Sequence, residues 1–260
     1  MSALKPHERI TAAIRATTAA GRTALVPYIT AGYPRKDQFI ATLKAIANEA
    51  DVVEVGVPFS DPMADGVTIQ RASHAAIASG VSLRWILNEL AAAAPFDAPI
   101  VLMSYLNPLL NLGYEPLAAA CVPAGVCGFI VPDLPLEESA DFVAALDARG
   151  LALIQLVTPA TPPERLKMLC GASRGFVYAV TVAGITGGAK ELPPEVPAYL
   201  ERVRALTKLP VCAGFGVRRA EQVRNLAPHT DGVIVGSALV EHLEAGKDPV
   251  AFLKALRSSP

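Results

Sequence analysis

The segment 54–66, EVGVPFSDPMADG, contains three carboxylates at the end of an apolar run. Glu54 stands inside the run, with Val53 and Val55 as its neighbours. A carboxyl group in such a strand must be solvated, paired with a basic group, or kept largely neutral by a raised pKa. A raised pKa suits an acid that transfers protons near pH 7. Glu54 is therefore a candidate proton-transfer residue, and an ion pair with a basic neighbour is the alternative.

The two aspartates of the segment have simpler interpretations when each is taken alone. Asp65 directly precedes a helix-like stretch at 67–79, where an aspartate commonly caps the helix. Asp61 lies between Ser60 and Pro62, which is typical of an exposed turn. Asp65 joins Glu54 in a site only if the loop folds back over the end of the strand.

Three glycine-containing loops form a second group of candidates, at 183–188, 214–216 and 236–237. Glycine lets backbone N–H groups approach an anion, and a helix that begins at Ser237 would point its positive end toward the same place. Each loop alone could be an ordinary tight turn. Together they favour a phosphate site held mostly by backbone amides, because these short turns contain no lysine.

Apolar, β-branched runs alternate with helix-like stretches along the chain, and the runs are mostly continuous, as in parallel strands covered on both faces. The expected strands are 24–30, 51–57, 100–105, 126–131, 151–157, 175–180, 210–214 and 231–236. The expected helices include 36–49, 67–79, 82–94, 135–149, 162–170, 195–206, 218–227 and 237–258. This alternation predicts an α/β fold of the (β/α)8 TIM barrel type, with a doubly wound open sheet as the alternative. Chemistry in such a barrel belongs on the loops after the strands.

The composition limits the classes of protein to which the chain can belong. The chain has 260 residues, a formal net charge of −1 and 52% hydrophobic residues, which gives no electrostatic argument for nucleic-acid or membrane binding. We expect a single domain over residues 1–260, without a signal peptide or a spanning helix. The four cysteines form no CxxC pair, which is typical of a reduced cytoplasmic protein.

Several short motifs lack the context that their chemistry needs. The GASRG sequence at 171–175 resembles a hydrolase elbow, but a helix precedes it and a strand follows, so we expect a turn at the far end of the barrel. A calcium loop starting at Asp61 fails because Met63 and Ala72 occupy ligand positions. Gly214-Phe-Gly216 lacks the third glycine of a dinucleotide fingerprint. The histidines show no metal-ligand spacing: His7, His74, His229 and His242.

The segment 54–66 resembles the hallmark segment of the tryptophan synthase α subunit family. Further matches follow in the family's order, and they extend over essentially the whole chain. They are Pro27-Tyr-Ile-Thr-Ala-Gly32, Asp133-Leu-Pro-Leu-Glu-Glu-Ser139, Tyr178 with Ala183-Gly-Ile-Thr-Gly187, Gly214-Phe-Gly216 and Gly236-Ser237-Ala238.

The resemblance implies a (β/α)8 barrel that cleaves indole-3-glycerol phosphate to indole and D-glyceraldehyde 3-phosphate. It implies that Glu54 protonates indole C3 and handles the glyceryl hydroxyl proton, and that Asp65 binds the indole N–H. Thr186 would close toward Asp65 as part of a lid. The phosphate would be bound by amides at Gly187, Phe215, Gly216, Gly236 and Ser237. The indole pocket would be lined by Tyr28, Met103, Ile130 and Tyr178.

The same resemblance implies an α2β2 complex with a β subunit, which carries pyridoxal phosphate and receives indole through a tunnel. The loop from Pro58 to Asp61 would contact this partner, and the chain itself would need no cofactor and no metal. Val67 and Val182 depart from residues common in the family, and Val182 could alter lid closure. The alternatives are a stand-alone lyase, another phosphate-binding barrel, and a non-catalytic activator of a β subunit.

Overall fold

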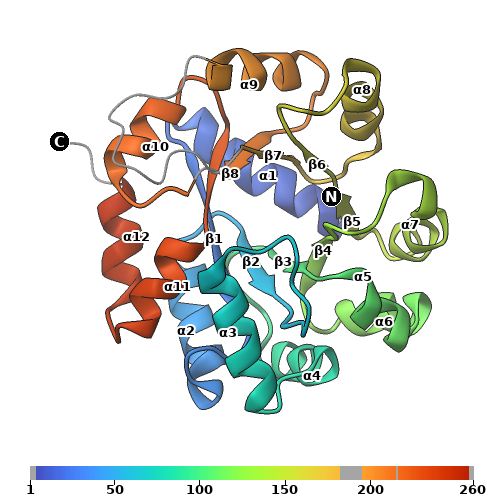
Figure 1. Cartoon of the computed structure of the whole chain (residues 1–260), viewed down its shortest axis with the longest axis vertical. Helices are drawn as coiled ribbons and strands as arrows, with labels where there is room; N and C mark the ends of the chain where they lie inside the picture. Colours follow the sequence, from blue (N-terminus) through green and yellow to red (C-terminus); the bar gives the residue numbers. More distant parts are fainter. Residues whose placement is uncertain (1–3, 182–194, 215, 258–260) are drawn as a thin grey trace.

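A parallel sheet forms the centre of the molecule, which is described by a computed structural model over residues 4–181, 195–214 and 216–257. Neighbouring strands in this part pair in the order β5-β4-β3-β2-β1-β9-β8-β7-β6, and every pair is parallel. The strands are β1 (Ala24–Thr30), β2 (Val53–Gly56), β3 (Ile100–Met103), β4 (Val126–Ile130), β5 (Ala152–Ile154), β6 (Leu156–Val157), β7 (Val177–Val180), β8 (Val211–Gly214) and β9 (Gly232–Val235). Their carboxyl ends therefore meet at one end of the molecule (Figure 1).

The sheet closes through a strand that is interrupted once. β5 and β6 stand at the two ends of the pairing order, yet only Gln155 separates them in the chain. The N–H of Gln155 donates to Ser173 Oγ at 3.0 Å instead of to a strand. Its carbonyl still accepts from Tyr178 N at 3.0 Å. The single strand expected at 151–157 is thus present with one irregular residue, and the predicted barrel is confirmed in nearly closed form.

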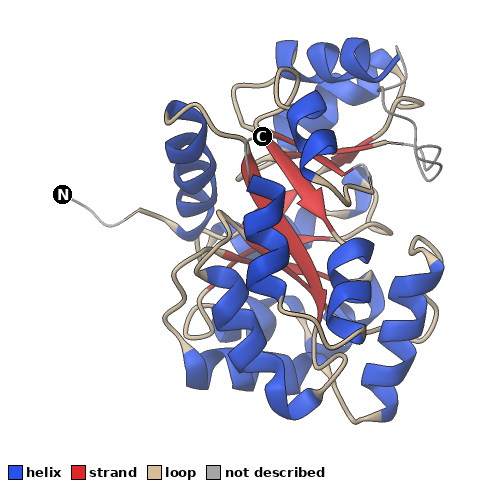
Figure 2. Ribbon diagram, turned by 90° about the vertical axis from the view of Figure 1, so that its left-hand side faces the viewer, coloured by secondary structure: helices blue, strands red, loops and turns tan. Residues whose placement is uncertain are grey.

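Helices surround the strands, as Figure 2 shows. The helices of the described part are α1 (Pro6–Ala19), α2 (Phe39–Ala47), α3 (Val67–Ala78), α4 (Leu83–Ala93), α5 (Leu106–Leu112), α6 (Tyr114–Cys121), α7 (Ala140–Asp147), α8 (Pro163–Ala172), α9 (Glu195–Ala205), α10 (Ala220–Leu226), α11 (Ser237–Glu244) and α12 (Pro249–Arg257), with 3-10 turns η1 (Lys36–Gln38) and η2 (Leu136–Glu138). The helix expected at 237–258 is two helices. Gly246 ends the first in the left-handed region (φ 69°), which suits glycine.

Helix α1 covers the amino-terminal end of the barrel, and the strand and helix patterns above did not include it. Ile10 and Ile14 on this helix are fully buried and pack with residues of the barrel interior. Thr11 Oγ1 donates to the carbonyl of Gly175 at 2.6 Å, which fixes the helix to the loop before β7. The base of the barrel is therefore closed by apolar side chains.

Two groups of apolar side chains hold the fold together. The larger lies between the strands and the surrounding helices, and the smaller fills the barrel interior. Burial of both faces explains why the strands are continuous apolar runs. Toward the carboxyl ends this interior also contains one fully buried carboxyl group, that of Glu54 on β2. In the described ranges, no helix is long and apolar enough to cross a bilayer.

Candidate active site

Glu54 points into the barrel from β2 and is almost completely buried, with 1% of its surface exposed. The register of β1 and β2 sets it opposite Tyr28. Its Oε2 has no hydrogen-bond partner among the described residues. None of the ion pairs formed by these residues involves Glu54, so the structure does not provide the basic partner that was the alternative interpretation.

The protonation of Glu54 follows from this environment. Burial, and then the nearby charge of Asp65, raise the pKa of Glu54 to about 8. The charged form is disfavoured because the apolar surroundings replace water and provide no hydrogen bond for it. Glu54 therefore carries a proton in the free protein near pH 7.

Asp65 lies close enough to Glu54 for its charge to act on that carboxyl, so the loop folds back over the strand end. It is not the cap of α3, because the N-cap position is Gly66 and no side chain caps the helix there. The interpretation of Asp65 as a helix cap is therefore wrong. Its backbone carbonyl instead accepts from Gln70 Nε2 at 2.9 Å. The carboxyl group of Asp65 is therefore not used as a helix cap, and it lies at the mouth of the barrel, which is the end formed by the carboxyl ends of the strands.

Tyr105, which the sequence interpretation missed, holds the Asp65 loop. Its hydroxyl accepts the N–H of Ala64 at 2.8 Å and hydrogen-bonds the carboxylate of Asp65. Its ring stacks on Phe59, with 5.0 Å between the ring centroids. Burial raises the pKa of Asp65 to about 6, and the hydrogen bond from Tyr105 opposes that rise. Asp65 is consequently ionised near pH 7 while Glu54 is not. The one signal in the sequence was that Tyr105 is the last residue of the expected strand 100–105.

The predicted indole-pocket residues come together around these carboxyls. Tyr28 is buried and its hydroxyl lies 3.3 Å from Thr30 Oγ1. Strand register sets Met103 beside Ile130, and both pack with Tyr178 in the interior group of apolar residues. The site therefore has an aromatic and aliphatic lining beside two carboxyls of different protonation.

Two strand glycines provide the room for the tyrosine rings. A Cβ at Gly56 would lie 2.5 Å from Tyr28 Cζ and closer still to its hydroxyl. A Cβ at Gly214 would lie 2.9 Å from the ring and hydroxyl of Tyr178. Any larger residue at these positions would displace a ring.

The glycine loops of the proposed phosphate site are partly described. Gly216, after β8, is in the left-handed region with φ 61°. Gly236 occupies the N-cap of α11 and Ser237 begins the helix, and no side chain caps it. The first amides of a helix have no partner within the helix, so α11 presents donors to the mouth. Thr186, Gly187, Phe215 and Val182 lie outside the described residues.

The rim of the mouth is formed by the loop after β2. Pro58 is buried, whereas Ser60 and Asp61 are exposed and joined by a 2.5 Å hydrogen bond between their side chains. Further along, Met63 and Val67 expose 87% and 75% of their surfaces. Two large apolar side chains are therefore exposed beside this end of the barrel.

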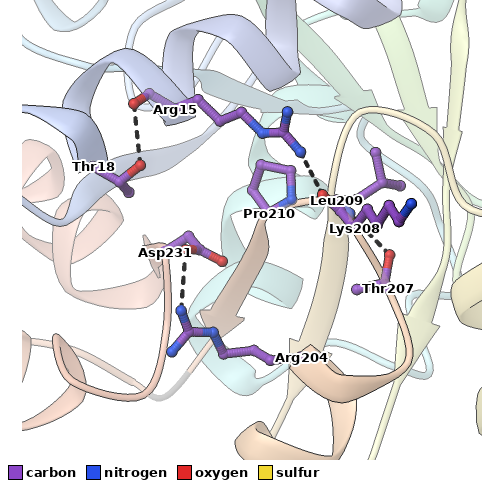
Figure 3. A pocket seen from close by; sticks show the side chains of 8 residues that line it. All are labelled: Arg15, Thr18, Arg204, Thr207, Lys208, Leu209, Pro210 and Asp231. Atoms are coloured by element: carbon purple, nitrogen blue, oxygen red, sulfur yellow. Dashed lines mark hydrogen bonds and ion pairs between the residues drawn. The ribbon is translucent and has the colours of Figure 1, made fainter.

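A cavity of about 310 Å3 lies at the opposite end of the barrel, and Figure 3 shows its lining. It is lined by Arg15, Thr18, Arg204, Thr207, Lys208, Leu209, Pro210 and Asp231. Its two guanidinium groups have partners in the protein: Arg15 donates to the carbonyl of Lys208, and Arg204 lies 3.7 Å from Asp231 (Figure 3). These guanidinium groups face separate partners, and we assign them to the packing of the barrel base.

The other sequence motifs have structural positions. Ser173 of the GASRG segment follows α8, is buried, and donates to the carbonyl of Phe176 at 2.6 Å. It thus lies in the expected helix-to-strand turn, away from the mouth. Ring nitrogens of His7, His74 and His242 lie at hydrogen-bond distance from backbone carbonyls. Over the described ranges, no three His, Cys, Asp or Glu side chains group as metal ligands.

Comparison with known proteins gives one consistent result. The profile of the family described as "Tryptophan synthase alpha chain" matches residues 14–258. A protein of that name from Nitratidesulfovibrio vulgaris (strain DP4) is 48% identical over 249 residues, which cover 95% of this chain and 97% of the relative. Another from Roseiflexus sp. (strain RS-1) is 46% identical over 248 residues, with 92% and 95% covered.

Solved structures agree with the sequence relatives. A crystal structure of tryptophan synthase from M. tuberculosis in an aminoacrylate-bound form has a chain that superposes with a TM-score of 0.87 at 37% identity, covering 96% of this chain and 98% of that one. Tryptophan synthase subunit alpha from Legionella pneumophila superposes with a TM-score of 0.85 at 36% identity, with 98% of each chain covered.

Proposed function

Because this chain belongs to the tryptophan synthase alpha chain family, we propose that it is a lyase of tryptophan biosynthesis that cleaves indole-3-glycerol phosphate to indole and D-glyceraldehyde 3-phosphate. The observation that carries the catalytic assignment is the buried carboxyl of Glu54, whose Oε2 has no hydrogen-bond partner among the described residues, beside the ionised Asp65. These are the two states that a retro-aldol cleavage of an indole requires, one acid and one stabilising anion.

The reaction begins with proton transfer from Glu54 to indole C3. The ring then carries a positive charge shared with its N–H, and the carboxylate of Asp65 accepts a hydrogen bond from that N–H. Glu54, now a carboxylate, takes the proton of the hydroxyl group on the side-chain carbon attached to C3. The bond between C3 and that carbon breaks, its electrons return to the ring, and the aldehyde leaves. Glu54 ends the cycle protonated, which agrees with its raised pKa.

The substrate would lie with its two ends on different parts of the mouth. Tyr28, Met103, Ile130 and Tyr178 supply an apolar slot for the indole ring. The amides at Gly216, Gly236 and Ser237 would bind the phosphate, joined by those of Gly187 and Phe215, and Thr186 would close the lid over Asp65. The first turn of α11, which no described side chain caps, supports the phosphate assignment.

The chain acts with a β subunit in an α2β2 assembly, and the exposed apolar rim supports contact at this end of the barrel. Asp61 on the exposed part of the rim would take part in that contact, next to the buried Pro58. Pyridoxal phosphate would belong to the β subunit, since the proposed cleavage uses only carboxyl groups and amides of this chain. A cytoplasmic location suits a biosynthetic enzyme whose four cysteines are buried and free.

The test is an assay of indole-3-glycerol phosphate cleavage with wild type, Glu54→Gln and Asp65→Asn, each with and without β subunit. We expect turnover to collapse in the first variant and to fall severely in the second. Wild-type inactivity even with β subunit would contradict the lyase assignment and favour a non-catalytic activator. Activity without complex formation, and without any rate change on adding β subunit, would favour a stand-alone lyase.

A further inference from the structure

Glu241 joins three segments that surround the mouth. It lies on α11 one turn after Ser237, so the two residues share a side of the helix. Its carboxylate accepts two hydrogen bonds from Arg218, at 2.6 and 3.1 Å, and one from Thr68 Oγ1 at 3.0 Å. Arg218 belongs to the loop between β8 and α10, and Thr68 to the first turn of α3. One carboxylate therefore links elements that are distant in the sequence.

Each of these segments carries part of the proposed site. Arg218 comes two residues after Gly216, Thr68 comes three residues after Asp65, and α11 begins at Ser237. Helices α3 and α11 lie side by side in Figure 1 and contact each other directly. Glu241 thus connects the loops for the phosphate end of the substrate with the loop for the indole end.

Ordinary stabilisation of the helix pair does not require Glu241. A second ion pair joins the same two helices one turn away, between Arg71 and Glu244 at 2.6 Å. The two pairs are similarly exposed: the side chains of Arg71 and Glu244 expose 49% and 35%, and those of Arg218 and Glu241 expose 51% and 36%. Only the pair with Glu241 also reaches the loop after β8. The pair with Glu241 therefore connects loops of the site, whereas the pair of Arg71 and Glu244 only joins two helices.

Resting on the function proposed above, we propose that Glu241 is a positioning residue that couples phosphate binding to the placement of Asp65. A phosphate bound at the amides of Gly216 and Ser237 orders the loop after β8 and the first turn of α11 against each other. Through Glu241, the same arrangement holds Thr68 and hence the loop of Asp65. The indole N–H then meets a carboxylate that is already in place.

The coupling is measured with two probes, indole and inorganic phosphate. The dissociation constant of indole is determined by calorimetry without phosphate and with saturating phosphate, and the ratio of the two values is the coupling factor. In wild type we expect phosphate to tighten indole binding at least about fivefold. In Glu241→Gln, Arg218→Gln and Thr68→Val we expect the factor to fall to within about twofold of unity.

Two comparisons separate coupling from damage to the fold. Glu244→Gln removes the neighbouring ion pair and should keep the wild-type coupling factor. The double variant Thr68→Val/Glu241→Gln should lose no more coupling than either single variant, because both changes break one connection. Thermal unfolding establishes that each variant is folded.

Three results would overturn the proposal: a coupling factor near unity in wild type, an unchanged factor in Glu241→Gln, or an equal loss in Glu244→Gln. If the enzyme still cleaves indole-3-glycerol phosphate, either of the first two results would refute the coupling through Glu241 and leave the proposed function intact. A wild-type chain that binds neither indole nor phosphate and lacks cleavage activity would remove both.

Discussion

Replacing Glu54 with glutamine should make the protein more stable and inactive. Glu54 is 1% exposed and its Oε2 has no hydrogen-bond partner in the described chain, so its ionised form is a buried charge without compensation. Glutamine has nearly the same shape and cannot ionise. The variant should match wild type in acid, where Glu54 is protonated in both the folded and the unfolded state, and exceed it in base.

The size of the effect follows from the pKa of Glu54, which is raised from 4.5 to about 8 by burial and by Asp65. The protonated carboxyl contributes its full stability below pH 4.5, and the contribution is lost as the pH rises through 8, because the unfolded chain releases the proton first. At about 1.4 kcal/mol per pH unit, the free energy of unfolding of wild type falls by roughly 5 kcal/mol relative to the variant over this interval.

Urea unfolding of both proteins between about pH 5 and about pH 9 measures this difference. Asp65 titrates in both proteins, so the difference between them reports the titration of Glu54 together with its interaction with Asp65. A constant difference for Glu54→Gln would refute the raised pKa. Wild-type turnover in Glu54→Gln would refute its role as proton carrier.

Two further changes test the surroundings of the site and the base of the barrel. Tyr105→Phe removes the hydrogen bond that lowers the pKa of Asp65. The acid limb of the plot of kcat/KM against pH should therefore move above its wild-type position near 6. An unmoved limb would contradict the role of Tyr105. Asp51→Asn leaves the guanidinium of Arg257, now paired at 2.7 Å, without its carboxylate and should cost about 3 kcal/mol of unfolding free energy in urea. Asp37→Asn, at a largely exposed ion pair, should leave the urea midpoint nearly unchanged.

The strands were predictable because their physical cause is local. A strand covered on both faces must be continuously apolar, and the predicted 24–30 coincides with β1. Helices α5 and α6 were not predicted, since Pro108, Gly113 and Pro116 resemble breaks when read along the chain. In the structure Gly113 separates the two helices with φ 84°.

The residues of the site also divide into those that a local sequence pattern predicts and those that it does not. Glu54 was predictable because a carboxyl inside an apolar run is anomalous wherever the strand lies. The roles of Tyr105 and Glu241 depend on folding: Tyr105 meets Ala64 across 41 residues of sequence, and Glu241 meets Thr68 across 173. No local sequence pattern predicts such contacts. They follow from the packing of loops and helices around the mouth.

Helix α1 has a consequence for the order of folding during synthesis. It is the first helix of the described chain to leave the ribosome, yet three of its hydrogen bonds join His7 to Gly150, Thr11 to Gly175 and Arg15 to Lys208, across 143, 164 and 193 residues. Its bond from Thr17 to Asp51 spans 34 residues and needs only the first strands. The three distant partners are made much later, and contacts of this separation form slowly. The helix made first therefore completes its contacts only after most of the barrel has been synthesised.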